Sequence, residues 1–201
     1  MDTLEKSVAT GKIFGVGLHK TGTSSLHHAL SLLGFRSFHA AGKHRKISEK
    51  TGTLFPQSIM SHYDAFTDHP FPTHFKEADR EYPNSKFILT VRDLDSWLQS
   101  VRRHIKRNQS NPFYRGAFGH YDETKEIALW HQHIEDVMTY FTARPNDFLI
   151  MNIIEGDGWT PLCAFLDLPV PPGPFPHWNK SVSRPYHLAS EFLKWLRGKY
   201  K

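Results

Sequence analysis

The 201-residue sequence contains only one cysteine, Cys163, and no run of about 18 apolar residues. A lone cysteine cannot form a disulfide within the chain, and its apolar neighbours predict a buried thiol in a reducing compartment. The lack of a long apolar run argues against a membrane-spanning helix. The charged N-terminus, Met1 to Lys6, has no apolar stretch of signal-peptide length. We therefore expect a soluble, cytoplasmic protein without a membrane partner.

The composition excludes intrinsic disorder and is sufficient for one core. Hydrophobic residues make up 39% of the chain, and 15 Phe, 7 Tyr and 5 Trp supply bulky side chains for that core. The sequence has no internal repeat, and its proline-dense stretch, Pro169 to Pro176, lies too near the C-terminus to separate two domains. We expect one domain over residues 1–201, with an N-terminal extension over 1–11 and a proline-rich segment and helix over 169–201.

Net charge alone does not identify a ligand. The 25 Lys and Arg residues exceed the 20 Asp and Glu residues by five, which fits an anionic small molecule, a nucleic acid or simple solubility. The densest basic run, Arg102 to Arg107, falls near the C-terminal end of an expected helix, where cations are favourable. We interpret this run as a solvated helix end and expect no nucleic-acid partner.

Short apolar segments alternate with helical patterns along the chain. The expected strands are 12–17, 36–40, 64–68, 86–91 and 148–152, and the expected helices are 24–33, 94–107, 124–142, 159–167 and 186–197. Strands separated by helices favour a parallel sheet covered on both faces. The predicted class is α/β, a three-layer parallel sheet of about five strands.

The first strand leads into a loop, Gly15 to Leu26, that is rich in glycine and hydroxyl residues. Glycines let the backbone turn tightly and aim N–H groups at an anion, and the following helix adds its dipole. This pattern predicts a phosphate-binding loop and a P-loop-type sheet. It differs from a Walker A loop because Lys20 precedes Gly22, which is followed by Thr23 and Ser24. A simpler alternative is that Thr23 or Ser24 only caps the helix.

A second candidate anion site follows the strand 86–91. Arg92 stands at the carboxyl end of that strand, the edge at which open α/β sheets bind ligands. Ser100 lies on the next helix, about 10 Å or less from its start at a rise of about 1.5 Å per residue. The two side chains are therefore able to hold one phosphate. Taken alone, an arginine such as Arg92 more often makes a surface ion pair, and a serine such as Ser100 more often makes an ordinary contact on a helix face.

The sequence offers no metal-binding pattern. The 14 histidines form no HExxH motif, and Arg92 stands at the position expected for a Walker B aspartate. His131, His133 and the pair His27 and His28 are expected on helix faces rather than around a metal. We expect no metal cofactor.

These motifs together carry a family resemblance. Lys20 to Ser25 resembles the 5′-phosphosulfate loop of the sulfotransferases that use 3′-phosphoadenosine 5′-phosphosulfate (PAPS), and Arg92 with Ser100 resembles their 3′-phosphate motif. The stretches 151–166 and 175–179 are similar to a compact subfamily of these enzymes. The resemblance implies direct in-line transfer of a sulfuryl group from PAPS to a hydroxyl or amine of a small-molecule or carbohydrate acceptor, without a metal.

The resemblance also implies roles for individual residues. Lys20 would contact the bridging oxygen and the 5′-phosphate, where it stabilises the charge that develops on the leaving group. Arg92 and Ser100 would hold the 3′-phosphate. The remaining loop residues would surround the 5′-phosphate: His19, Thr21, Gly22, Thr23, Ser24 and Ser25.

The transfer requires a general base, and Asp68 and His69 are the candidates. In related enzymes the segment after the third strand supplies this base. We favour Asp68, because it ends a strand at the same edge as the loop and because apolar neighbours would raise its pKa. The alternative is that Asp68 only opens the turn at His69-Pro70.

The chain lacks the C-terminal Arg-Lys-Gly phosphate clamp of the aryl and steroid sulfotransferases. Lys180 and Arg184 are candidates to replace it, or else surface cations. The adenine is expected against Ile154 and Trp159, although Trp159 is equally suited to anchor the core. Irregular segments over 41–63 and 108–121 are expected to form the acceptor pocket.

Two other functions fit parts of the pattern. An ATP-dependent small-molecule kinase on the same scaffold is suggested by the glycine loop alone, but the Gly-Lys-Ser/Thr order and a Walker B acid are missing. A protein that binds the product 3′-phosphoadenosine 5′-phosphate (PAP) without turnover would need the same phosphate contacts. The PAPS-dependent sulfotransferase is the hypothesis that uses all the motifs.

Overall fold

A computed structural model describes the chain over residues 11–39, 56–111 and 121–177. Its centre is a five-stranded sheet of order β2-β3-β1-β4-β5, in which every neighbouring pair is parallel. The strands are β1 (Ile13–Gly15), β2 (Ser37–His39), β3 (Ala65–Thr67), β4 (Lys86–Thr90) and β5 (Phe148–Met151). The expected α/β class and all five expected strands are confirmed.

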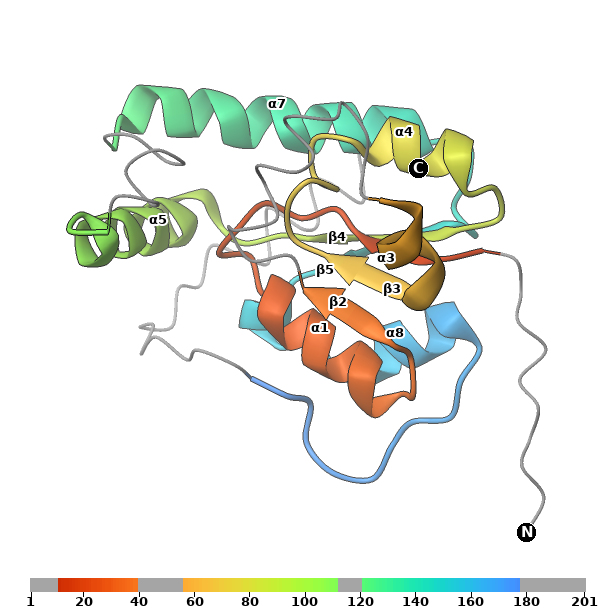
Figure 1. Ribbon diagram of the computed structural model, residues 1–201. Coiled ribbons are helices and arrows are strands. Elements are labelled where there is room, and N and C mark those ends of the chain that lie inside the picture. The colour runs from red at the N-terminus through yellow and green to blue at the C-terminus, as the bar shows by residue number, and fades with distance from the viewer. Residues whose placement is uncertain (1–10, 40–55, 112–120, 178–201) are drawn as a thin grey trace, which may run out of the picture.

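Helices cover both faces of the sheet (Figure 1). They are α1 (Thr23–Leu32), α3 (Gln57–His62), α4 (Phe75–Glu81), α5 (Leu94–Asn108), α7 (Glu123–Phe141) and α8 (Trp159–Leu166), with a 3-10 turn, η2 (Ile153–Glu155). One face carries α1 and α8, and the other carries α4, α5 and α7. The expected three-layer arrangement is therefore confirmed.

Two of these helices, α3 and α4, were not among the helices expected from the sequence. They contain six and seven residues, too few turns for a helical periodicity to stand out. Each gains its stability from the core, in which α3 buries Met60 and α4 buries Phe75 and Ala78. The helix expected over 186–197 lies outside the described residues.

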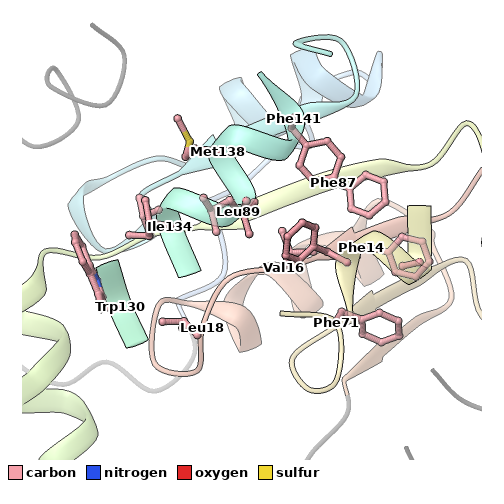
Figure 2. Packing of buried hydrophobic residues seen from close by; sticks show 14 of the residues in the cluster. Phe14, Val16, Leu18, Phe71, Phe87, Leu89, Trp130, Ile134, Met138 and Phe141 are labelled. Carbon is pink, nitrogen blue, oxygen red and sulfur yellow. The ribbon is translucent and has the colours of Figure 1, made fainter. Parts of the chain in front are cut away.

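The alternation of side chains along the strands divides the interior into two cores. In β1, Phe14 packs against the α4, α5 and α7 face, whereas Ile13 packs against the α1 and α8 face. Figure 2 shows the first of these cores, in which Val16 and Leu18 continue from β1 toward the side chains of α7. The second core holds Cys163, and burial raises the pKa of that thiol.

The strand order predicts a ligand-binding crevice at one edge of the sheet. From β1, which is central, the chain builds β2 and β3 on one side and β4 and β5 on the other. In open parallel sheets, ligands bind at the carboxyl ends of the strands on either side of such a reversal. The segments that follow β1, β3 and β4 therefore meet at the place where a ligand is expected.

The longest described helix, α7, has 19 residues and carries polar side chains on its exposed face. Across the described ranges, no helix combines the length and the apolar character that crossing a bilayer requires.

The aromatic cluster around Phe14 gives a test of this packing. The ring of Phe14 is fully buried and lies 5.1–6.0 Å, between centroids, from four aromatic rings: Phe66, Phe71, Tyr82 and Phe87. Phe14→Ala should lower the free energy of unfolding by about 3–5 kcal/mol, because it removes the ring and leaves a cavity. Leu32→Ala, at a side chain that is 65% exposed, should change it by less than about 0.5 kcal/mol. Urea unfolding of both variants makes the comparison, and equal losses would contradict the packing.

Candidate active site

Four chain segments meet at the carboxyl edge of the sheet. The loop of residues 16–22 follows β1, Asp68 follows β3, Arg92 comes two residues after β4, and His39 ends β2. Lys20, Asp68 and Arg92, which the sequence selects separately, are thus brought to one edge. Their electrostatic influence on one another confirms the proximity, because both Asp68 and Arg92 affect the pKa of Lys20.

The loop after β1 is held through its carbonyl oxygens. Four of them accept hydrogen bonds from side chains, three of which come from other parts of the chain. The bonds are His133 Nε2 to Val16 O (2.8 Å), Thr21 Oγ1 to Leu18 O (2.6 Å), Trp97 Nε1 to His19 O (2.7 Å) and Arg92 Nη1 to Lys20 O (3.3 Å).

These bonds determine where the loop N–H groups point. In a trans peptide, the N–H of the next residue is directed opposite to the carbonyl. Carbonyls that point into the protein therefore turn the N–H groups of residues 17, 19, 20 and 21 the other way. Lys20 has a left-handed backbone (φ 67°), as does Gly22 (φ 110°), a feature typical of loops whose successive N–H groups surround an anion.

Gly17 is required because a side chain would not fit at this position, rather than because of its backbone conformation. A Cβ built on Gly17 would lie 2.0 Å from Thr90 Oγ1 and 2.5 Å from Thr90 O. The loop backbone passes so close to the end of β4 that no side chain fits between them. Gly22 instead supplies the left-handed turn at the start of α1, where its own carbonyl accepts the first helical bond, from Leu26.

The loop hydroxyls do not all face the same way. Thr21 Oγ1 lies 2.7 Å from Thr90 Oγ1, so its hydroxyl braces the loop against β4. Thr23 and Ser25 are buried, whereas Ser24 is half-buried and its Oγ lies 3.3 Å from His39 Nε2. Gly22, not Thr23 or Ser24, occupies the N-cap of α1, and no side chain caps the helix. The capping alternative is therefore wrong, and Ser24 is the loop hydroxyl best placed to meet a ligand.

Lys20 is half-buried in a field of cations. Its pKa is lowered, first by burial and then by Arg107, while Asp68 acts in the opposite direction. Arg103 also contributes to the lowering. Arg103 and Arg107 are solvent-exposed, as expected for a solvated helix end, yet they face the loop closely enough to add to its positive potential.

Arg92 is only 4% exposed and makes two contacts that orient it. Its Nε donates to Ser96 Oγ at 2.7 Å, and its Nη1 donates to Lys20 O. Burial lowers its pKa, Arg103 lowers it further, and Asp93 and Glu155 oppose the change. The guanidinium carries five N–H donors, so these two bonds leave others for an anion.

Ser96 is a site residue that the sequence analysis missed. It lies on α5 one turn before Ser100, and both side chains are buried. The side chain of Asp93 caps α5 by accepting from Ser96 N at 3.1 Å. The spacing of the two serines, four residues apart on one helix face, was the available signal.

Asp68 faces the same edge with a strained backbone (φ 72°). Its Oδ1 accepts from His69 N at 2.9 Å, so the turn-forming role suggested by the sequence is present. Burial raises the pKa of its carboxyl, against the effects of the His69 bond and of Lys20. A carboxylate with a raised pKa beside a lysine is typical of a proton acceptor.

His39 is the second site residue that the sequence analysis missed. It lies at the carboxyl end of β2, where its Nε2 is 3.6 Å from Asp68 Oδ2 and its Nδ1 is 2.8 Å from Thr67 Oγ1. The sequence places it near the end of an expected strand, but no local pattern distinguishes it from the other histidines.

Two residues were expected to contact the adenine, and two others to replace the 3′-phosphate clamp. Trp159 is buried in the core between α1 and α8, where its Nε1 donates to Gly173 O at 3.1 Å and its ring packs on Phe175 at 4.9 Å. The position of Trp159 agrees with the alternative that this side chain anchors the core. Ile154 is half-buried in η2, beside Ile153, which packs under Gly22. Lys180 and Arg184 lie outside the described residues.

The two histidines of α7 differ in their surroundings. His133 is buried and its Nε2 donates to Val16 O, while His131 is exposed. Burial lowers the pKa of His133, so it is a neutral donor at pH 7. Among residues 11–39, 56–111 and 121–177, no group of three or more His, Cys, Asp or Glu residues is arranged to hold a metal ion.

Comparison with known proteins agrees with this arrangement. The family described as "Sulfotransferase domain" matches residues 12–118 and 110–183. Ava biosynthesis cluster protein M of Aspergillus versicolor is 26% identical over 208 residues, which cover 83% of this chain and 80% of that protein.

The close approach of Gly17 to β4 can be tested directly. Gly17→Ala should lower the free energy of unfolding by about 1–3 kcal/mol, because the new methyl forces the loop away from Thr90. Gly15→Ala is the matched control, since its methyl would meet only side-chain carbons, at 3.0 and 3.1 Å, and its loss should be smaller. Urea unfolding measures both, and a Gly17→Ala variant as stable as wild type would refute the steric argument.

Proposed function

The chain belongs to the sulfotransferase domain family, and we propose that it transfers a sulfuryl group from PAPS to a hydroxyl or amine of a small-molecule or carbohydrate acceptor. The observation that carries this proposal is the meeting of three groups at one sheet edge: a loop with inward carbonyls and Lys20, a buried Arg92, and Asp68. Each group matches one requirement of the reaction.

The two cationic positions support a donor with anionic groups at both ends. When bound, PAPS supplies a sulfur–oxygen bond to its 5′-phosphate, whose cleavage is the chemical step. Lys20 and the outward N–H groups of the loop would stabilise the charge left on the 5′-phosphate. Arg92, with Ser96 and Ser100 on the same face of α5, would hold the 3′-phosphate.

Asp68 supports the acceptor half of the reaction. The acceptor oxygen or nitrogen forms the new bond to sulfur, and the electron pair of the old bond remains on the 5′-phosphate. Asp68 takes the proton that the acceptor loses, and its raised pKa makes it a better proton acceptor than an ordinary aspartate. His69, the next residue, is the second candidate for this role.

A small-molecule acceptor is consistent with the sulfotransferase domain family. The name of the relative, Ava biosynthesis cluster protein M, places that protein in a biosynthesis cluster. The acceptor walls are expected from 41–63 and 108–121, of which 56–63, 108–111 and Tyr121 are described.

The donor is tested by binding of the product PAP without Mg²⁺. PAP at about 100 times its Kd should raise the melting temperature by roughly 5–10 °C. Arg92→Ala should weaken PAP binding by about 10- to 100-fold, because a charged hydrogen bond to phosphate is lost. The loss should be smaller for adenosine 5′-monophosphate, which has no 3′-phosphate and is affected only through the missing Arg92 bond to Lys20 O. Calorimetric titration gives both affinities.

Arg80→Ala is the control variant, since Arg80 is exposed on α4 away from the crevice. Equal affinity of wild type for PAP and the monophosphate would exclude the 3′-phosphate site. Tighter binding of ATP that requires Mg²⁺ would favour the kinase. PAP binding without transfer of labelled sulfuryl to any acceptor in a broad screen would favour the non-catalytic protein.

The base is tested with the acceptor that a screen with labelled PAPS identifies. The carboxylate form of Asp68 is the active one, so the rate should rise with pH through a midpoint above that of an ordinary aspartate. Asp68→Asn should reduce turnover by about 10²- to 10⁴-fold and abolish that rise, while PAP affinity is retained. Full turnover in Asp68→Asn, combined with loss in His69→Gln, would assign the base to His69.

A further inference from the structure

One imidazole joins three parts of the site. His39 is half-buried at the end of β2, and its ring contacts a hydroxyl of α1, a hydroxyl of β3 and the carboxylate that follows β3. The distances are 3.3 Å from Nε2 to Ser24 Oγ, 2.8 Å from Nδ1 to Thr67 Oγ1, and 3.6 Å from Nε2 to Asp68 Oδ2.

We propose that His39 is a positioning residue that holds Asp68 at the sheet edge and, through Ser24, makes that hold depend on what occupies the donor loop. The inference rests on the proposed function, in which Ser24 meets the 5′-phosphate and Asp68 takes the acceptor proton. It adds a link between the two halves of the reaction, from Ser24 on α1 to Asp68 after β3.

The contacts favour one tautomer of the ring. If Nδ1 donated its proton to Thr67, the bare lone pair of Nε2 would face the carboxylate of Asp68, which is repulsive. If Thr67 donates to Nδ1 instead, Nε2 carries the proton and offers it to Ser24 Oγ and Asp68 Oδ2. Thr67 is fully buried, and its Oγ1 lies 2.8 Å from Nδ1.

The Nε2–H then has Ser24 Oγ as its hydrogen-bond acceptor at 3.3 Å and Asp68 Oδ2 as a nearby electrostatic partner at 3.6 Å. A Ser24 hydroxyl that donates to a phosphate becomes a better acceptor, since chained hydrogen bonds strengthen each other. Phosphate at the loop would therefore draw the Nε2–H toward Ser24 and loosen its hold on Asp68. The carboxylate would be freer to turn to the acceptor proton once the donor is bound.

The surroundings keep His39 neutral at pH 7. Its pKa is lowered, first by burial and then by His28. The His27 ring stacks on it at 5.4 Å, and the pKa of His27 is itself lowered to about 4 by burial and by its histidine neighbours. Asp68 is the acidic group that faces it, with Lys20 beyond. A neutral donor holds Asp68 without a full positive charge, so the raised pKa of the carboxyl persists.

The experiment is NMR titration of ¹⁵N-histidine-labelled protein, with the His39 signals assigned from their absence in His39→Gln. Without ligand, Asp68→Asn should move the His39 titration midpoint to lower pH, because the carboxylate that favours the imidazolium is gone. Asp136→Asn is the control, since Asp136 is exposed on α7 and bonds Gln132. It should leave the midpoint unchanged.

The second arm adds PAP. The Nε2 signal of His39 should shift on binding in wild type, and that shift should be lost in Ser24→Ala. An unchanged His39 midpoint in Asp68→Asn overturns the positioning role whatever PAP does. A wild-type His39 signal that stays fixed while PAP binds overturns the link to the loop. Failure of wild type to bind PAP overturns the proposed donor instead, so the two failures are distinguishable.

Discussion

The β1–α1 loop is held from behind by donors on α5, on α7 and at the end of β4. Trp97, His133 and Arg92 each direct an N–H into a loop carbonyl, and Thr21 closes the set from within the loop. Because a planar peptide has its two polar groups on opposite sides, this arrangement orients the loop amides before any ligand arrives. The anion-binding character of the site thus depends on buried bonds to carbonyls rather than on the ligand-facing residues alone.

Those bonds require the packing beneath them. Trp97 is fully buried, and His133 is buried among the residues by which α7 covers the sheet. The loop itself contributes Val16 and Leu18 to the same core (Figure 2). The loop is therefore continuous with the core on its inner side, and it exposes Lys20 and Ser24 on its outer side. Such a site is preorganised, which is the condition under which fixed dipoles stabilise charge effectively.

The charged groups at this edge have shifted pKa values. Burial disfavours the charged forms of both Lys20 and Asp68, lowering the pKa of the first and raising that of the second, and each partly offsets the change in the other. The surrounding arginines lower the pKa of Lys20 further. Binding of a ligand with two anionic groups would offset the repulsion among these cations. Relief of that repulsion would therefore contribute to the free energy of binding.

The sequence was sufficient for the features that local pattern controls. Buried strands, long amphipathic helices, the glycine loop, and Arg92 at a strand end all follow from short-range periodicity and spacing. Helices as short as α3 and α4 do not, since tertiary contacts rather than periodicity stabilise them. The roles of His39, Trp97 and His133 depend on partners tens of residues away, His133 on a carbonyl 117 positions earlier. Trp159 shows the same limit, because its burial and its contacts with Gly173 and Phe175, none of them visible in the local sequence, mark it as a core residue.

The four side chains that donate hydrogen bonds to the loop carbonyls limit how the sequence of such a protein can vary. Trp97, His133, Arg92 and Thr21 all lie in described helices, strand ends or the loop itself, and none falls within 40–55 or 112–120. Trp97 lies on α5, His133 on α7 and Arg92 just after β4, so three separate parts of the chain each supply a donor to the loop. Relatives that keep these donors inherit the same orientation of the loop amides, whatever else in their sequences differs.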